Sequence, residues 1–302
     1  MSDENQKRID RLKVYQGDDR VVGSAELRKE LDTQKPNPVR FESGWPDLEK
    51  YINGLEGGEM IGITGLPKSG KTLLAQNLTL HALQQGIMSI WFSYELSIRQ
   101  FLARMPADKD FFTPKIMIPH NMTWIADRIL ESKLKYNTRL VVIDHLHYLV
   151  DLERKGGNIS VDIGAIIRKL HRWAISMNVV IILLCHATKA QGIGGVQREL
   201  GAGDARDSGM ISAEVDSMWA VMRVHEGIRD MNYVENGVVV KVCHHRRTGI
   251  LDKKVFLRKP KQDDIRLAQC GYKFQNWQDE PKFFKDFNEP KDGGDGDDIV
   301  PF

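Results

Sequence analysis

The stretch "MIGITGLPKSGKTLLAQNLTLHAL", residues 60–83, decides how this chain of 302 residues is expected to fold. It begins with a short apolar run, passes through a glycine-rich turn and ends in a helical pattern. The turn, residues 65–72, fits the spacing G-x-x-x-x-G-K-[ST]. A strand that leads through such a turn into a helix predicts a phosphate-binding loop at the end of a buried strand. The alternative is a glycine-rich turn that fits the pattern by chance.

The residues of this loop have separate expected roles. The glycines let the backbone curl so that its N–H groups point at phosphate oxygens. Lys71 would reach the terminal phosphates, and the Thr72 hydroxyl would bind Mg²⁺. The expected cofactors are therefore ATP and Mg²⁺. The predicted nucleotide-binding residues are Gly65, Leu66, Pro67, Lys68, Ser69, Gly70, Lys71 and Thr72.

Apolar runs alternate with helical patterns from about residue 41 to 260. Short, continuously apolar strands separated by helices predict an α/β fold with a mostly parallel sheet flanked by helices. The last three strand candidates have little helix between them, which predicts antiparallel strands at the C-terminal end. The strand candidates are residues 60–64, 88–94, 115–119, 139–144, 179–185, 218–224 and 237–243, and helix candidates are residues 24–32, 71–85 and 162–177.

Composition argues against a membrane protein and against a secreted protein held together by disulfides. The chain is 41% hydrophobic and 28% charged, as soluble globular proteins are, and its net charge of +2 points to no class of partner. Three widely spaced cysteines suit a reducing compartment. The charged start and the lack of a long apolar run predict no membrane partner and a cytoplasmic location, in the host cytoplasm if the chain is viral.

Two carboxylates follow predicted strands. Asp144 ends residues 139–144, where a P-loop protein needs an acid to hold the magnesium shell. Many such ATPases have a glutamate directly after this aspartate, but here the next residue is His145. Glu95 follows the run "SIWFSY" and could orient and deprotonate the attacking water, because the C-terminal ends of parallel strands converge. The alternative is a structural glutamate paired with an arginine.

At this point the motifs resemble the RecA-like motor domain of DnaB-type hexameric replicative helicases, over most of residues 40–260. The similar segments include the approach to the loop from "FESGW", and then "FSYELSIRQFLAR", "LVVIDHLHYL", "IILLCHATK", "GDARDSGMISAEVD" and "HHRRTG". The resemblance implies a RecA-like P-loop NTPase fold and a homo-oligomer, expected to be a hexameric ring. Related stripped-down rings and proteins such as RadA and KaiC also lack the N-terminal primase-binding domain of larger members, which is not expected here.

The resemblance also implies residue roles. Glu95 matches the catalytic base, His186 matches the γ-phosphate sensor that is usually glutamine, and Arg246 matches an arginine that acts in trans. His244 stands where the family has a lysine, so less positive charge is expected there at neutral pH. The implied catalytic set is Glu95, Lys71, Arg246 and His186, and the implied metal set is Thr72 and Asp144.

Two loops after predicted strands are expected to contact single-stranded DNA. Both are rich in glycine and carry cationic side chains, which suits tracking a phosphate backbone without reading bases. Ordinary surface loops are the alternative. A zinc site from Cys185, His186, Cys243, His244 and His245 is disfavoured because no pair has finger-like spacing. The candidate DNA-binding residues are Arg154, Lys155, Lys189 and Arg198.

The chain divides into three expected parts: an N-terminal arm or linker (1–40), a RecA-like ATPase motor domain (41–262), and a C-terminal extension with a disordered acidic tail (263–302). The tail ends in "GDGDDIVPF", residues 294–302, which resembles the acidic tip of bacterial single-stranded DNA-binding proteins. Phe302 and the nearby acids could dock on a replication partner. A solubilising end is the alternative.

The expected function is an ATP-dependent DNA helicase or translocase in replication, acting as a ring-shaped oligomer that hydrolyses ATP at subunit interfaces. The alternative is a RecA-, RadA- or KaiC-like ATPase in recombination or regulation that does not unwind duplexes. Unwinding itself cannot be inferred from residue types.

Overall fold

The computed structural model describes residues 3–33, 39–106, 109–150, 159–187, 200–205, 208–223, 237–258 and 267–270. Contacts divide the chain into two units, Met1–Pro38 and Val39–Phe302. The first unit contains two helices, α1 (Asp3–Lys13) and α2 (Ser24–Thr33), and α1 buries none of its residues. The helix predicted over residues 24–32 is therefore present.

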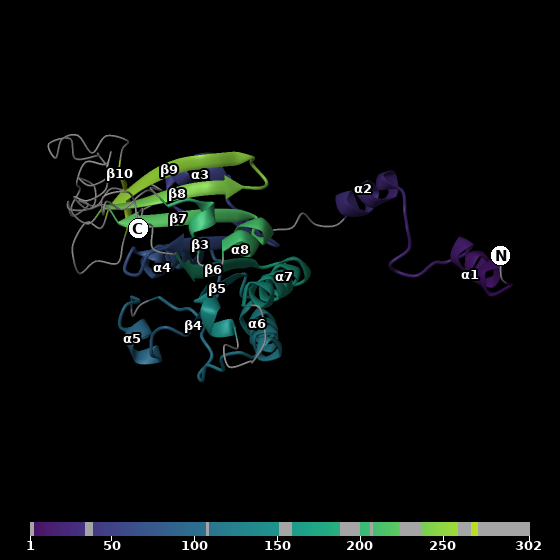
Figure 1. The fold of residues 1–302 in the computed structure, drawn as a ribbon, viewed down its shortest axis with the longest axis horizontal. Helices are drawn as coiled ribbons and strands as arrows, with labels where there is room; N and C mark the ends of the chain where they lie inside the picture. The colour runs from purple at the N-terminus through teal and green to yellow at the C-terminus, as the bar shows by residue number, and fades with distance from the viewer. Residues whose placement is uncertain are drawn as a thin grey trace, which may run out of the picture. The chain divides into compact units, whose positions relative to one another are not determined.

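The second unit is built on an eight-stranded sheet with the order β10-β9-β8-β7-β3-β6-β5-β4 (Figure 1). Five neighbouring strands are parallel and three at one side are antiparallel. The parallel strands are β3 (Met60–Gly65), β4 (Ser89–Ser93), β5 (Leu140–Asp144), β6 (Val180–His186) and β7 (Ser217–Arg223). The antiparallel strands are β8 (Gly237–His245), β9 (Ile250–Arg258) and β10 (Ala268–Cys270).

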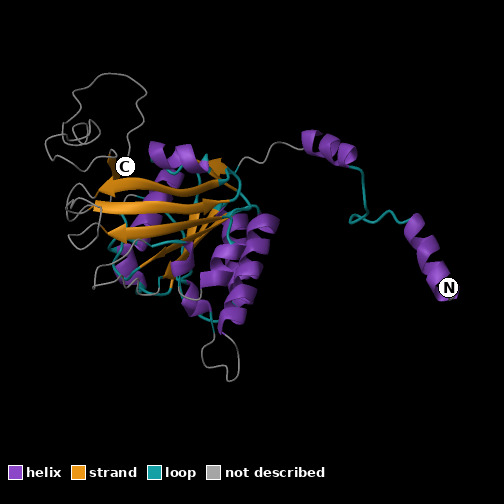
Figure 2. Cartoon of the chain, turned by 45° about the horizontal axis from the view of Figure 1, so that its top comes forward, coloured by secondary structure: helices purple, strands orange, loops and turns teal. Residues whose placement is uncertain are grey.

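Helices cover both faces of this sheet (Figure 2). One face packs on α3 (Pro46–Ile52) and α4 (Lys71–Gln84), and the other on α6 (Met122–Tyr136), α7 (Ile159–Met177) and α8 (Ser208–Glu214). In β6, Ile181 and Leu183 belong to one core and Val180 and Ile182 to the other. Because both faces are buried, the strands are continuously apolar, as the sequence indicates. The predicted α/β class, with a mostly parallel sheet flanked by helices and antiparallel strands at the C-terminal end, is confirmed.

The remaining elements are short. A two-stranded sheet pairs β1 (Arg40–Phe41) with β2 (Leu55–Glu56) just before β3. Helix α5 (Ile98–Leu102) follows β4 and begins with a capping box in which Ser97 and Gln100 bond each other's backbone amides. The short 3₁₀ helices are η1 (Leu146–Leu149) and η3 (Ala202–Asp204). In the part of the chain that the structure describes, no helix is long and apolar enough to cross a membrane.

The strand predicted over residues 115–119 is wrong. The edge of β4 is instead covered three residues earlier, where Phe112 forms an isolated bridge with Ile90 and its carbonyl accepts from the Trp91 amide at 2.8 Å. Pro114 has no amide hydrogen and cannot extend this pairing. Ile116 is consequently 73% exposed rather than buried in a strand.

The predicted antiparallel pairing is present between β7 and β8, although β7 is parallel to its other neighbour, β3. The prediction is wrong for β6, which lies between β3 and β5 as a parallel strand. Strand β9 was not predicted at all. Its first half is mostly exposed and includes Asp252, Lys253 and Lys254, so it lacks the continuous apolar run that marks the buried strands. Strands with one solvent-exposed face are harder to identify for this reason.

Candidate active site

The loop after β3 has the backbone of a phosphate-binding loop. Gly65 ends the strand, and a Cβ atom there would lie 2.5 Å from the Val221 carbonyl oxygen. Gly70 caps α4 with φ of 103°, a conformation that side chains disfavour. These two positions therefore require glycine for local steric reasons, and together they direct the chain into the N-terminus of α4.

Lys71 is buried at the start of α4 and its ammonium is held inside the loop. Nζ donates to the carbonyl oxygens of Gly65 at 2.9 Å and Leu66 at 3.0 Å. Burial lowers the pKa of Lys71, and the nearby carboxylates of Asp144 and Glu95 oppose that change. The ammonium thus lies where a phosphate oxygen could replace the two carbonyls as its partner.

Asp144 ends β5 beside the loop, 1% exposed. The Thr72 hydroxyl donates to its Oδ2 at 2.9 Å. Its Oδ1 is buried and has no hydrogen-bond partner among the described residues. Burial raises the pKa of Asp144 to about 6, with Glu95 adding to the rise and Thr72 and Lys71 opposing it. A buried carboxylate oxygen without a donor, beside a threonine hydroxyl, fits the donor set of a hydrated Mg²⁺ ion.

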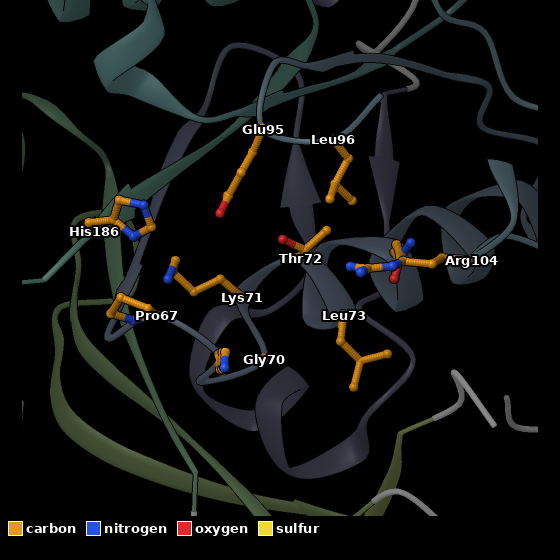
Figure 3. Close-up of a pocket in the computed structure, with 11 residues that line it drawn as sticks. Pro67, Gly70, Lys71, Thr72, Leu73, Glu95, Leu96, Arg104 and His186 are labelled. Atoms are coloured by element: carbon orange, nitrogen blue, oxygen red, sulfur yellow. The ribbon is translucent and has the colours of Figure 1, made fainter. Parts of the chain in front are cut away.

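Glu95 lies two residues beyond the end of β4, on the rim of a pocket of about 520 Å³ (Figure 3). The Tyr94 amide donates to the Asp144 carbonyl at 2.6 Å, which ties this segment to β5. Glu95 itself is exposed, so no carboxylate is buried at the end of the apolar run. The residues lining the pocket are Pro67, Lys68, Gly70, Lys71, Thr72, Leu73, Gln76, Glu95, Leu96, Arg104 and His186.

The pocket brings together most of the predicted catalytic set. In Figure 3, Glu95 and Lys71 extend into the same space, and His186 lies beside them. His186 is the last residue of β6 and is in register with Gly65 of β3. Arg104 lines the same pocket but forms no ion pair with Glu95 within the described part of the chain. The roles of these residues stay predictions.

His145, which the sequence marked only as the residue in place of a glutamate, is part of this site. Its ring meets the ring of His186 edge-on, with centroids 3.9 Å apart. Ligand-type atoms of Glu95, His145 and His186 all lie within 4.8 Å of one another. The signal that could have identified His145 is its position directly after Asp144, because that backbone position is fixed by the strand.

Arg246 lies at the opposite edge of the sheet from the pocket. Its amide donates to the Asp216 carbonyl at 2.7 Å, and the Asp216 amide donates to the carbonyl of Met60, where β3 begins. Its guanidinium bonds Asp216 Oδ1 at 3.3 Å and the Ala213 carbonyl at 2.9 Å, with 54% of the side chain exposed. Arg246 is thus linked to the start of β3, whereas the pocket lies at the other end of this strand. Arg246 therefore does not contribute to the pocket of its own chain.

Arg247 is a second arginine of the same turn, directly after Arg246 and two residues before Gly249. Its guanidinium donates to Glu59 Oε1 at 2.7 Å and to the carbonyls of Ile52, Asn53 and Gly54. These bonds hold Arg247 against its own chain. The more exposed Arg246 is therefore the arginine available to a neighbouring molecule.

His244 is half-buried beside Arg246, and burial is the main cause that lowers its pKa. A histidine whose pKa lies below its usual value is mostly neutral at pH 7, so this position adds little positive charge. The structure also separates the residues of the zinc site that the sequence disfavours. His244 and His245 lie at the edge where the parallel strands begin, whereas His186 lies at their C-terminal edge.

The predicted DNA-binding residues, Arg154, Lys155, Lys189 and Arg198, lie outside the described residues, and so does the tail over residues 294–302. These assignments stay predictions.

Known proteins resemble the chain in sequence. The family model "DnaB-like helicase C terminal domain" matches residues 41–117. A "Probable replicative DNA helicase" of Trieres chinensis is 25% identical over 229 residues, which cover 65% of this chain and 50% of that protein. The "Replicative DNA helicase DnaB" of Rickettsia conorii is 24% identical over 230 residues, 61% of this chain and 45% of that protein. The chain therefore matches about half the length of these curated relatives.

Solved structures share the fold. "The Structure Of A DnaB-Like Replicative Helicase And Its Interactions With Primase" superposes with a TM-score of 0.68 at 17% identity, covering 88% of this chain and 71% of that chain. A second solved structure, described as an "ATPase Domain", gives a TM-score of 0.67 at 17% identity, covering 82% of this chain and 97% of that chain. The resemblance to DnaB-type motor domains that the motifs predict is thus confirmed in sequence and, through the RecA-like fold, in structure.

Proposed function

We propose that this protein is an ATP-dependent DNA helicase that acts in replication as a ring-shaped oligomer, expected to be hexameric. The observation that carries the proposal is the convergence of Lys71, Thr72 and Glu95 on one pocket of a RecA-like fold, with Asp144 bonded to Thr72 beside it. The sequence relatives are replicative helicases, which favours this function over a RecA-, RadA- or KaiC-like ATPase without unwinding.

The nucleotide would bind with its phosphates along the loop of residues 65–72. The Lys71 ammonium would exchange its two carbonyl partners for phosphate oxygens of a nucleotide bound in this pocket. Thr72 and Asp144 would hold Mg²⁺, and the cation would offset the burial that raises the pKa of Asp144. When bound, Mg²⁺ supplies positive charge that stabilises the transferring phosphoryl group.

Glu95 would act as the base that orients and deprotonates the attacking water. It is exposed on the rim of the pocket, so it can reach a water molecule without first breaking an ion pair. His186, at the end of β6, would contact the γ-phosphate from the other side. This division of roles leaves the developing phosphate charge to Lys71 and to a cation from another subunit.

Arg246 would be that cation, acting on the nucleotide of a neighbouring subunit. The pocket of its own chain lies at the far end of β3, and 54% of its side chain is exposed. The ion pair with Asp216 links the arginine to the start of β3, which would fix its position at a subunit boundary. An arginine supplied in trans is worth on the order of 10³-fold or more in rate.

Single-stranded DNA would pass through the centre of the ring. Arg154, Lys155, Lys189 and Arg198 are the proposed contacts, from loops that follow β5 and β6 in the chain. Within this scheme residues 41–262 form the motor, residues 1–40 an arm or linker, and residues 263–302 an extension whose acidic tip would dock on a replication partner.

A forked-duplex unwinding assay with ATP tests this function directly. The protein should separate the strands, and Lys71→Ala should not. Hydrolysis that single strands stimulate, without any strand separation by the wild-type protein, would instead support the alternative of a non-unwinding ATPase.

A further inference from the structure

We propose that Glu95, His145 and His186 form a binding site for a transition-metal ion of the Zn²⁺ class, distinct from the Mg²⁺ site at Thr72 and Asp144. The three side chains come from the ends of three neighbouring strands, β4, β5 and β6. One ligand-type atom from each lies within 4.8 Å of the other two.

The donor set favours zinc over magnesium. Two imidazoles and one carboxylate suit Zn²⁺ and its neighbours among the first-row metals, whereas Mg²⁺ prefers oxygen ligands throughout. Two histidines and a glutamate leave a fourth tetrahedral position open to water or substrate. Here that position would face the pocket, because Glu95 and His186 both line it.

The geometry needs only a small closure. Ligands at about 2.0–2.2 Å from a tetrahedral metal lie about 3.3 Å from one another, so the present separations would have to shrink by at most about 1.5 Å. The histidines are fixed at the strand ends, with ring centroids 3.9 Å apart. Glu95 is exposed and beyond the end of its strand, so its side chain can make most of this movement.

A hydrogen bond to His145 opposes binding weakly. His145 Nδ1 accepts a hydrogen bond from the His147 amide, and at 3.4 Å this bond is long. If Nε2 of His145 takes the metal, its proton moves to Nδ1 and this bond is lost. A neutral hydrogen bond of this length contributes little, so its loss is small beside the free energy of zinc binding at structural sites.

A metal bound here would occupy both Glu95 and His186. For that consequence alone the inference depends on the proposed function: zinc would remove the base and the γ-phosphate contact together and so inhibit hydrolysis. Chelation would reverse the inhibition. Zinc binding itself requires no ATP and can be measured in its absence.

Calorimetric titration of the full, chelator-treated chain with Zn²⁺, without nucleotide, tests the site. Co²⁺ as a second probe should give the visible absorption of a four- or five-coordinate ion. Glu95→Ala and His186→Ala should each weaken Zn²⁺ binding by about 10-fold or more. His147→Ala is the matched control, because His147 is adjacent to the site but outside the three-residue cluster, and it should retain binding.

Two results would overturn the proposal: no Zn²⁺ binding by the wild-type protein at about 100 μM, or affinity unchanged in both Glu95→Ala and His186→Ala. Because these two residues lie at the pocket surface, their variants are expected to fold. A further arm uses His145→Asn, which should also weaken Zn²⁺ binding by about 10-fold or more. A wild-type protein that binds zinc but never hydrolyses ATP would refute the proposed function and leave the metal site intact.

Discussion

The two edges of the parallel strands differ in how well their charges are balanced. At the C-terminal edge, Lys71 and Asp144 are buried. Burial lowers the pKa of Lys71 and raises the pKa of Asp144, and both shifts favour the neutral forms. At the opposite edge, Asp216 accepts from the Met60 amide and pairs with both His171 and Arg246, so its charge has partners on three sides. The C-terminal edge can therefore bind charged ligands. At the opposite edge the charged groups already have partners, and only the Arg246 side chain is largely exposed. Substitutions at the C-terminal edge should therefore mainly change ATP hydrolysis, and substitutions at the opposite edge should mainly change stability.

The largest expected effect is at the pocket edge. Glu95→Gln keeps the shape of the side chain and removes the base, so ATP hydrolysis should fall by roughly 10²-fold or more while nucleotide binding is retained. Steady-state hydrolysis and a fluorescent-nucleotide titration measure the two quantities separately. Hydrolysis near the wild-type rate would show that Glu95 is not the base.

Asp144 should make stability depend on pH in the absence of Mg²⁺ and nucleotide. In the native state the pKa of Asp144 is about 6, whereas its ordinary pKa is 3.8. The native state thus binds more protons between these values, and the free energy of unfolding falls by about 3 kcal/mol as pH rises through that window. Asp144→Asn has no such proton to lose, so it should melt above the wild type at pH 8 and close to it at pH 4.

Thermal melts at both pH values check this, with Asp127→Asn as the control that removes an exposed carboxylate of α6. The same difference between Asp144→Asn and wild type at both pH values would contradict the assignment of the buried charge.

The smaller effects distinguish the two arginines of the turn. Arg247→Ala leaves the carbonyls of Ile52, Asn53 and Gly54 without this donor and should cost about 2–3 kcal/mol of unfolding free energy. Arg246→Ala removes a side chain that is 54% exposed and leaves Asp216 its bonds to His171 and the Met60 amide, so it should cost about 1 kcal/mol or less. Urea denaturation measures both. Equal costs would mean that the turn does not hold the two side chains differently.

Sequence patterns predicted the parallel sheet and the pocket because both depend on local rules. A buried strand must be apolar throughout, and a phosphate-binding loop needs glycine at Gly65 and Gly70. What could not be predicted depends on contacts between distant segments. The edge pairing of Phe112 with Ile90 displaced the strand expected at residues 115–119, and the packing of β5 beside β6 brought His145 against His186.

The choice between Arg246 and Arg247 shows the same limit. The two arginines are adjacent in the sequence, and only the contacts of Arg247 with the segment before β3 separate a structural arginine from an available one. Spacing therefore located the turn, whereas the hydrogen-bond partners of each guanidinium distinguish the roles.

The central claim, that the two edges of the sheet meet across a subunit boundary to form one catalytic site, is tested most directly by mixing two inactive variants. Arg246→Ala keeps an intact loop and Lys71→Ala keeps an intact arginine, so about a quarter of the interfaces in a random equimolar ring would hold both. We expect each variant alone to be inactive and their mixture to recover ATP hydrolysis. No recovery in mixtures shown to co-assemble would contradict a shared site.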